Sequence, residues 1–353
     1  MLPLPALTSA ASTTSKREVH WRERNRFHSL LPSGLQGTLR YLRTRSRITN
    51  LGVLLLAAFA SLSFIYNLSF VFSSPFYDAY LKYSTPSSIL ATIERNETLT
   101  SLDHLIIVPG HAIWTGIRPE HAWDEEFWTL EEYQKGGGRI SAFMDHIKQG
   151  VSLALEDEKS LLVFSGGQTR LLSTTTEAES YLRLALSLNL FGNHYSDPSA
   201  PSPFSRATTE TYALDSFQNL LFSLARFREI TSRYPSRITV ISYEMKRRRF
   251  EELHRVAVRF PAQFFQYVGI EPVASEIEST KARDGEFRNG YKPYTIDLYG
   301  CHDFLLAKRR ARNLFLRFHP YHSSAPELRG LLEWCPSDPT ELFQGPLPWD
   351  ASE

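Results

Sequence analysis

Glycines, a histidine and an arginine follow two short apolar runs of this sequence, and together they could bind an anion. Gly110 and His111 follow the run 105–108, whereas Ser165-Gly166-Gly167-Gln168-Thr169-Arg170 follows the run 161–164. Glycine lets the backbone approach a ligand closely, and free backbone amides bind anions. Histidine exchanges protons near neutral pH, and the arginine fork pairs with phosphate or carboxylate. We therefore predict proton exchange at His111 and ligand binding at Gly110, Ser165, Gly166, Gly167 and Arg170.

Two threonine-led segments carry glutamates that could act as general bases. In Thr174-Thr175-Thr176-Glu177-Ala178-Glu179, Thr174 with Glu177 and Thr176 with Glu179 both have the spacing of a capping box, which predicts a helix start. Thr208-Thr209-Glu210-Thr211 has a similar composition, so we expect a second helix start there. Thr176 and Thr209 would donate to the ligand, and Glu177 or Glu210 would be the base, with His111 as partner. Alternatively, both glutamates only complement the helix dipoles.

A run of four basic residues, Lys246-Arg247-Arg248-Arg249, follows a third apolar run at 238–241. Such a cluster could hold an anion, although a solvated face is the commoner role of a charge run. On an α-helix Arg247 shares a side with Phe250, so we predict that Arg247 contacts the ligand. The acidic cluster 156–158 reads as a solvated helix end, and we expect no metal site.

The apolar runs alternate with longer amphipathic stretches. The runs 105–108, 161–164, 238–241 and 264–268 are typical of buried parallel strands. Helical length and period characterise the stretches 129–155, 175–190, 208–233, 246–260 and 303–316. The pattern predicts an α/β fold, a Rossmann-like open and mostly parallel sheet with helices on both faces. Ligands of such sheets bind beyond the carboxyl ends of the strands, where the polar motifs fall.

An uncharged, apolar run precedes this domain, at 49–77. About 20 helical residues cross the ~30 Å core of a bilayer, which makes the lipid bilayer a predicted partner. The net charge of +1 hides a basic N-terminal segment with Lys16, Arg17, Arg22, Arg24, Arg26, Arg40, Arg43, Arg45 and Arg47. Because such residues resist translocation, we predict a single-pass signal-anchor with a cytoplasmic N-terminus, and no nucleic-acid partner. A buried core helix is the alternative.

This topology places the domain in the lumen of the secretory pathway, in the endoplasmic reticulum or Golgi rather than at the plasma membrane. Asn96-Glu97-Thr98 is then an N-glycosylation acceptor at Asn96. Cys301 and Cys335 could form one disulfide or stay thiols, because spacing alone does not decide. The predicted parts are a disordered tail 1–48, an anchor 49–74, a connector 75–101, the Rossmann-like domain 102–320 and a C-terminal tail 321–353.

The order of these motifs resembles that of the SanA/ElyC/YdcF-like family, also called domain of unknown function 218. The resemblance covers about 102–317 and is closest to the fungal, membrane-anchored branch, through the segments 128–134 and 146–150. It implies a Rossmann-like fold with a cleft at these loops. Bacterial relatives are linked to envelope integrity, and S-adenosylmethionine is the cofactor that the resemblance suggests. The positions that match the family motifs are Gly110, Ser165, Gly166, Gly167, Glu177 and Arg247.

Two departures from the family pattern bear on the chemistry. The Thr-x-Glu-Asn element of the family matches 208–211 or 216–219, each incompletely. Glu244 stands where many bacterial members have histidine. Either His111 or His254 compensates for that histidine, or the site only binds.

The sequence therefore predicts a membrane-anchored domain that binds a small anionic or nucleotide-like ligand. Its activity would be that of a hydrolase or transferase in envelope or glycoconjugate metabolism. A glycosyltransferase is disfavoured, because the Asp-x-Asp motif that often binds the metal in such enzymes is absent. A non-catalytic scaffold or assembly factor of the secretory pathway is the alternative. The oligomeric state stays open.

Overall fold

The computed structural model describes residues 48–72, 94–95, 97–192 and 204–350. The chain divides into two units, 1–92 and 93–353. The predicted acceptor Asn96 and the tail 1–47 lie outside the described residues.

The described part of the first unit is one helix, α2 (Ile48–Phe72), which contains no charged residue. Its polar side chains bond within the helix: Asn67 Nδ2 donates to the carbonyl of Ser63 at 2.7 Å, and Ser69 Oγ to the carbonyl of Tyr66 at 2.7 Å. A helix that satisfies its own polar groups can lie in hydrocarbon. The helix is long and apolar enough to cross a bilayer, and its segment Leu51–Ser69 is not buried by other parts of the protein. It fits a single-pass membrane protein, as predicted.

The second unit is built on a parallel sheet with the order β5-β4-β1-β6-β7. Its strands are β1 (His104–Pro109), β4 (Ser160–Ser165), β5 (Ala207–Glu210), β6 (Arg237–Tyr243) and β7 (Phe265–Ile270). The chain runs outward from β1 through β4 to β5, then returns to β6 on the other side of β1. This is the strand order of a Rossmann-like sheet, and its topological switch point lies between β1 and β6. The predicted fold class is confirmed.

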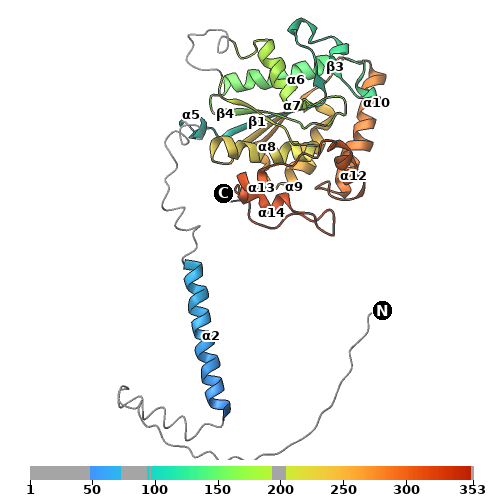
Figure 1. The fold of residues 1–353 in the computed structure, drawn as a ribbon. Coiled ribbons are helices and arrows are strands. Elements are labelled where there is room, and N and C mark those ends of the chain that lie inside the picture. The colour runs from blue at the N-terminus through green and yellow to red at the C-terminus, as the bar shows by residue number, and fades with distance from the viewer. Residues whose placement is uncertain (1–47, 73–93, 96, 193–203, 351–353) are drawn as a thin grey trace, which may run out of the picture. The chain divides into compact units, whose positions relative to one another are not determined.

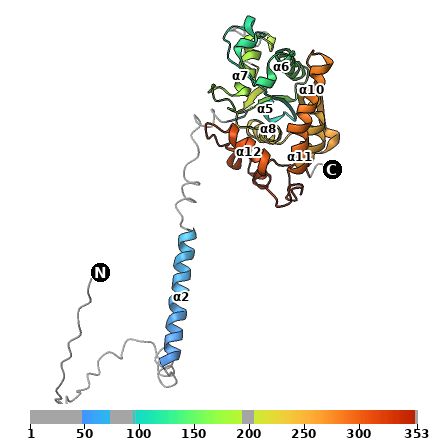
Figure 2. The same cartoon turned by 90° about the vertical axis from the view of Figure 1, so that its right-hand side faces the viewer.

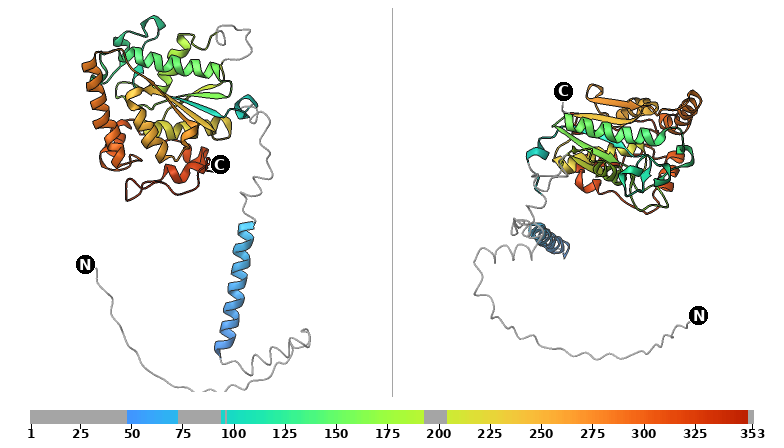
Figure 3. Two further views of the ribbon diagram at one scale, coloured as in Figure 1. Left: turned by 180° about the vertical axis from the view of Figure 1, so that it is seen from behind. Right: turned by 90° about the horizontal axis from the view of Figure 1, so that it is seen from above.

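Helices cover both faces because alternate residues of each strand point to opposite sides. Ile106 and Val108 pack with α6 (Arg139–Glu156) and α7 (Glu177–Ser187). Leu105 and Ile107 pack in a second core with α8 (Ser216–Thr231). Figures 1 and 2 both show α6 and α8 on opposite sides of the sheet, and Figure 3 shows these layers from behind and from above.

The remaining elements are short. The helices are α5 (Glu97–Thr100), α9 (Arg255–Ala257), α10 (Glu276–Glu286), α11 (Lys292–Ile296), α12 (Asp303–Arg312), α13 (Tyr321–Ser324) and α14 (Arg329–Leu332). The antiparallel pair β2 (Ile113–Trp114) and β3 (Trp128–Thr129) lies between β1 and α6. Two π-helical segments occupy Arg249–His254 and Phe287–Tyr291, and short 3-10 turns occupy Pro119–His121, Glu125–Phe127, Glu132–Gln134, Glu244–Lys246, Ala262–Phe264 and Pro326–Leu328.

The structure corrects two predicted helix starts and adds one helix. Residues 207–210 form strand β5, not the start of a helix, and α8 begins only at Ser216 behind its N-cap Asp215. The helix expected from 129 starts at Arg139, because three glycines, Gly136, Gly137 and Gly138, adopt positive φ just before it. The helix α10 was not predicted, since it buries no side chain and so carries no apolar stripe.

The segment 321–353, predicted as a tail, supplies part of the core through Tyr321, Ala325, Leu328, Leu331, Phe343, Leu347 and Trp349. The domain therefore extends beyond residue 320. A disulfide joins Cys301 to Cys335, with 5.9 Å between their Cα atoms. This pairing, which the sequence left open, ties the C-terminal segment to the residues before α12.

Candidate functional site

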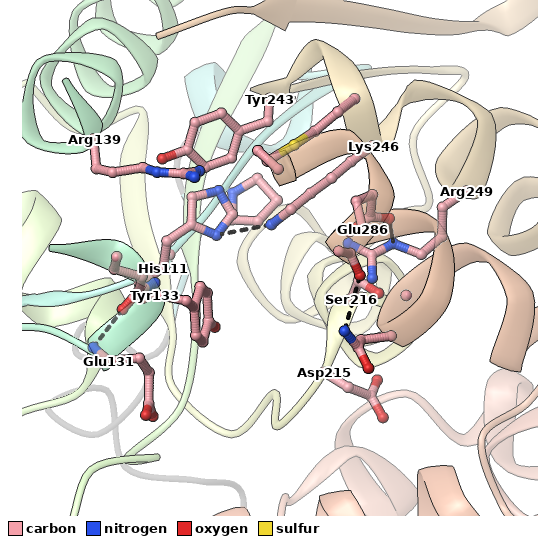
Figure 4. A pocket seen from close by; sticks show the side chains of 18 of the residues that line it. His111, Glu131, Tyr133, Arg139, Asp215, Ser216, Tyr243, Lys246, Arg249 and Glu286 are labelled. Atoms are coloured by element: carbon pink, nitrogen blue, oxygen red, sulfur yellow. Dashed lines mark hydrogen bonds and ion pairs between the residues drawn. The ribbon is translucent and has the colours of Figure 1, made fainter. Parts of the chain in front are cut away.

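A pocket of about 870 Å³ opens at the carboxyl ends of β1 and β6, the switch point of the sheet. Gly110 and His111 line it after β1, and Lys246 and Arg249 line it after β6. Helices α10 and α12 complete the wall. The close-up in Figure 4 shows His111 and Lys246 pointing toward one another, with Tyr243 above them and Arg249 beside Glu286.

His111 and Lys246 form the centre of the pocket. Lys246 Nζ lies 3.2 Å from His111 Nδ1, and His111 Nε2 lies 3.0 Å from Ser242 Oγ. Burial, with a contribution from the nearby Arg249, lowers the pKa of Lys246 to about 7. Burial and the charge of Lys246 hold the pKa of His111 well below its usual value. Near neutral pH the lysine therefore changes charge, while the histidine stays neutral and accepts a hydrogen bond from the ammonium.

Other cations surround this pair. Lys308 Nζ donates to the carbonyl of Asn289 at 3.2 Å, and Arg312 Nη1 donates to the carbonyl of Leu214 at 2.8 Å. Within the described residues, Lys246, Lys308 and Arg312 form no salt bridge, whereas Arg249 pairs with Glu286 at 3.2 Å. Burial and the neighbouring guanidinium groups lower the pKa of Lys308 to about 8. Like charges gathered in a partly buried space favour an anionic ligand.

Arg170 and Glu177 line the pocket, as predicted, but both have partners in the protein. Arg170 Nη1 lies 2.9 Å from Glu131 Oε1, and Arg170 Nη2 donates to the carbonyl of His111 at 3.0 Å. Glu177 accepts a hydrogen bond from Thr169 Oγ1 at 2.6 Å. These residues hold the loops after β1 and β4 together at one wall.

The glycine motif does not cradle an anion in this geometry. The amides of Gly110, Gly166 and Gly167 donate to the carbonyls of Ser165, Glu210 and Ala213 at 2.7, 3.0 and 2.7 Å. A Cβ atom at Gly110 or Gly166 would lie 2.5 or 2.8 Å from the Cβ atom of Glu177. The glycines are needed because the start of α7 packs against this loop, and the prediction of free amides is corrected.

Ser165 and Glu210 belong to a closed cluster behind the pocket. Both are buried, and Ser165 Oγ lies 2.9 Å from Glu210 Oε2. Glu210 also accepts from Tyr321 Oη at 3.0 Å and from the amides of Tyr212 and Ala213 at 2.8 and 3.2 Å. Burial raises the pKa of Glu210. However, Glu210 is not among the residues that line the pocket. Its predicted role as a base is therefore corrected to a structural one.

Both predicted threonine donors have structural roles. Thr176 is the N-cap of α7, where its side chain and that of Glu179 form the predicted capping box. Thr209 lies in β5, and its carbonyl accepts from Arg226 Nε at 3.1 Å. Of the two stretches that matched the family element, 216–219 stands at a helix start, and Ser216 and Asn219 line the pocket.

Arg247 does not line the pocket, contrary to the prediction. It makes two contacts of 2.6 Å with Glu244 and lies over the ring of Tyr267. The segment 244–254 is a 3-10 turn followed by a π-helical turn, so the α-helical spacing behind the prediction does not apply. The residues that line the pocket are its neighbours Lys246 and Arg249. His254 is buried, 2.8 Å from Ser216 Oγ, and does not line the pocket.

The fold and the pocket define a Rossmann-like α/β protein with one apolar helix that could span a membrane. No family model and no solved structure matches this chain. The uncharacterized protein YOR238W of Saccharomyces cerevisiae is 30% identical over 261 residues, which cover 62% of this chain and 86% of the yeast protein. This chain belongs to the same family as that yeast protein.

Proposed function

We propose that this protein binds a small anionic ligand, phosphate-bearing or nucleotide-like, in the pocket between β1 and β6. One observation carries the proposal: Lys246, Lys308 and Arg312 share the pocket and form no salt bridge within the described residues. All three are half-buried, and charges held partly out of water without an opposite charge are costly. An anion that bridged these groups would supply the missing charge.

The pair of Lys246 and His111 offers proton transfer as well as binding. A lysine whose pKa is about 7 can act as an acid or a base at neutral pH. This chemistry suits a hydrolase or transferase that acts on a phosphorylated substrate in envelope or glycoconjugate metabolism. Protonated Lys246 would neutralise the substrate, and neutral Lys246 would accept a proton from an attacking hydroxyl group.

A non-catalytic role has support of its own. Glu210 is enclosed, and Glu177 is held by Thr169 and lies 3.8 Å from Arg170. Neither predicted carboxylate is therefore placed as a free base. If the anion binds without turnover, the domain is a ligand-responsive scaffold.

We further propose a type II topology, with the domain in the lumen of the endoplasmic reticulum or Golgi. The basic residues before α2 and the Cys301–Cys335 disulfide support this orientation, because disulfides persist in oxidising compartments. In microsomes, the domain should resist protease until detergent is added, and glycosidase treatment should shift the wild-type band but not that of Asn96→Gln. Digestion of the domain in intact microsomes would exclude this orientation.

Isothermal titration calorimetry with sulfate tests the binding site, because sulfate keeps its charge between pH 6 and pH 8.5. The full chain in detergent should bind sulfate, and its affinity should fall as pH rises through about 7, where Lys246 loses its proton. Lys246→Gln should weaken binding about tenfold or more, the scale of one charge-assisted hydrogen bond, and remove most of the pH dependence. Arg248→Gln is the matched control, because Arg248 is exposed and pairs with Glu252.

Absence of sulfate binding to the wild-type chain at pH 6 would contradict the proposal. Equal affinities for the wild-type chain and Lys246→Gln would show that the anion binds elsewhere.

A further inference from the structure

Exposed apolar side chains follow two of the pocket-lining residues in the chain. Leu171 and Leu172, which are 72% and 89% exposed, directly follow the pocket-lining Arg170. Leu316 and Phe318, 71% and 80% exposed, follow Arg312. Leucine and phenylalanine side chains at this exposure gain free energy when an apolar partner covers them.

Hydrogen bonds of residues near each apolar pair reach the same stretch of chain, 211–214. Arg312 Nη1 donates to the carbonyl of Leu214 at 2.8 Å, and Arg317 Nη2 lies 3.3 Å from Thr211 Oγ1. From the other side, the amide of Gly167 donates to the carbonyl of Ala213 at 2.7 Å. The loop 167–172 and the segment 312–318 therefore flank one edge of the pocket, and we call Leu171, Leu172, Leu316 and Phe318 the apolar rim.

We propose that the ligand is an amphiphile: a phosphate monoester of a hydrocarbon chain, with its phosphate among Lys246, Lys308 and Arg312 and its chain on the apolar rim. This inference rests on the proposed anion binding. A small water-soluble anion would need the cations but not the rim, whereas a lipid-like anion uses both. The apolar helix α2 adds a reason, because a chain held in a bilayer meets such amphiphiles at high local concentration.

The expected gain in affinity follows from the free energy of removing hydrocarbon from water. Each methylene removed from water strengthens binding about fourfold when it is fully covered. A six-carbon chain that is partly covered should still gain about tenfold over one carbon, whereas a phosphate that binds alone should show no dependence on chain length.

Calorimetry with the full chain in nanodiscs of zwitterionic lipid tests this, with methyl phosphate, hexyl phosphate and hexanol as probes. Hexyl phosphate should bind about tenfold more tightly than methyl phosphate. The double variant Leu172→Ser, Phe318→Ser should reduce this ratio below threefold and leave the affinity for methyl phosphate unchanged. Ile117→Ser is the matched control, because Ile117 is 89% exposed and belongs to the stretch 112–130, which supplies no residue to the pocket lining. It should keep the wild-type ratio.

The outcomes separate the two proposals. Equal affinities for methyl and hexyl phosphate would overturn the amphiphile and leave the anion site standing, with a free phosphate ester as the ligand. If neither phosphate binds, the anion site itself fails. If hexyl phosphate and hexanol bind equally, and Lys246→Gln does not change this, partition into the nanodisc explains the signal and the inference is overturned.

Discussion

Two buried polar clusters lie at the carboxyl ends of the strands, one around Glu210 and one around Lys246. Four hydrogen bonds from within the protein reach the carboxylate of Glu210. The ammonium of Lys246 meets His111 Nδ1 and, among the described residues, no carboxylate within salt-bridge distance. Both regions are rich in residues that could do chemistry, so residue type alone does not separate them. The difference lies in whether the protein supplies the partners.

The cluster around Glu210, whose members are all paired within the protein, connects separate parts of the fold. Through Ser165 and Tyr321 it joins the end of β4 to the C-terminal segment, and through two amides it shapes the turn after β5. In the open cluster around Lys246, partly buried cations line one pocket without an ion pair among the described residues, and we expect this to cost stability. A region that costs stability and faces a pocket is where function is expected.

The largest expected effect is the loss of stability in Glu210→Ala. The change leaves Tyr321 and two amides without their acceptor, whereas Ser165 Oγ can still donate to Asn219 Oδ1. Each unsatisfied buried group costs about 1–3 kcal/mol. We expect the free energy of unfolding to fall by about 3–5 kcal/mol, measured by urea denaturation of the full chain in detergent. Glu210→Gln, which keeps the acceptor oxygen, should lose less. A loss below about 1 kcal/mol in Glu210→Ala would mean that the cluster is not closed as described.

Lys246→Met should stabilise the protein, in contrast to Glu210→Ala. At pH 6.5 we expect the free energy of unfolding to rise by about 1–2 kcal/mol, because an unpaired buried charge is removed. The pKa of Lys246 is about 7 in the folded protein, against an ordinary value of 10.5. Between these values the unfolded wild-type chain binds more protons, so its stability rises with pH, whereas below about 7 the full penalty applies.

The advantage of Lys246→Met should therefore shrink as the pH rises from 7 toward 10. Urea denaturation at several pH values measures this. An advantage that stays constant with pH, or a variant less stable than the wild-type chain at pH 6.5, would contradict the open character of the cluster.

The smallest effects should distinguish neighbours within the basic run. Arg249 is buried, lines the pocket and pairs with Glu286, whereas Arg248 is exposed. Arg249→Gln should weaken sulfate binding about threefold to tenfold, and Arg248→Gln less than twofold, since exposed ion pairs contribute little. Calorimetry with both variants measures the contrast. Equal effects would indicate a diffuse field of charge instead of a site.

Local patterns were enough for much of the architecture. The uncharged run predicted α2, and the continuous apolar runs predicted β1, β4, β6 and β7, because burial on both faces leaves that trace in the sequence. The capping-box spacing predicted a helix start within 174–179, and the structure selects the match of Thr176 with Glu179 as the start of α7. Strand β5 was missed because four residues, only one of them buried, carry little periodicity.

The candidate site was predicted only in part. Gly110, His111, Arg170 and Glu177 line the pocket, as expected from their places after β1 and β4. The basic run predicts a cation at the site, and α-helical spacing favours Arg247. In the structure, Lys246 and Arg249 line the pocket instead. Lys308 and Arg312, on α12, had no local signal that could link them to a turn some 60 residues earlier.

Residue order alone was sufficient for the apolar helix, the parallel sheet and the edge of the sheet at which the pocket opens, since each depends on patterns within a few residues. The sequence alone does not determine which charged side chains form hydrogen bonds or ion pairs within the protein. Partnering depends on distances between atoms far apart in the chain, as for Glu210 with Tyr321 or Lys246 with His111. Folding surrounds the carboxylate of Glu210 with donors, which makes it stable in the interior. It leaves Lys246, Lys308 and Arg312 without an ion pair among the described residues, and we propose that an anion from outside supplies the missing charge.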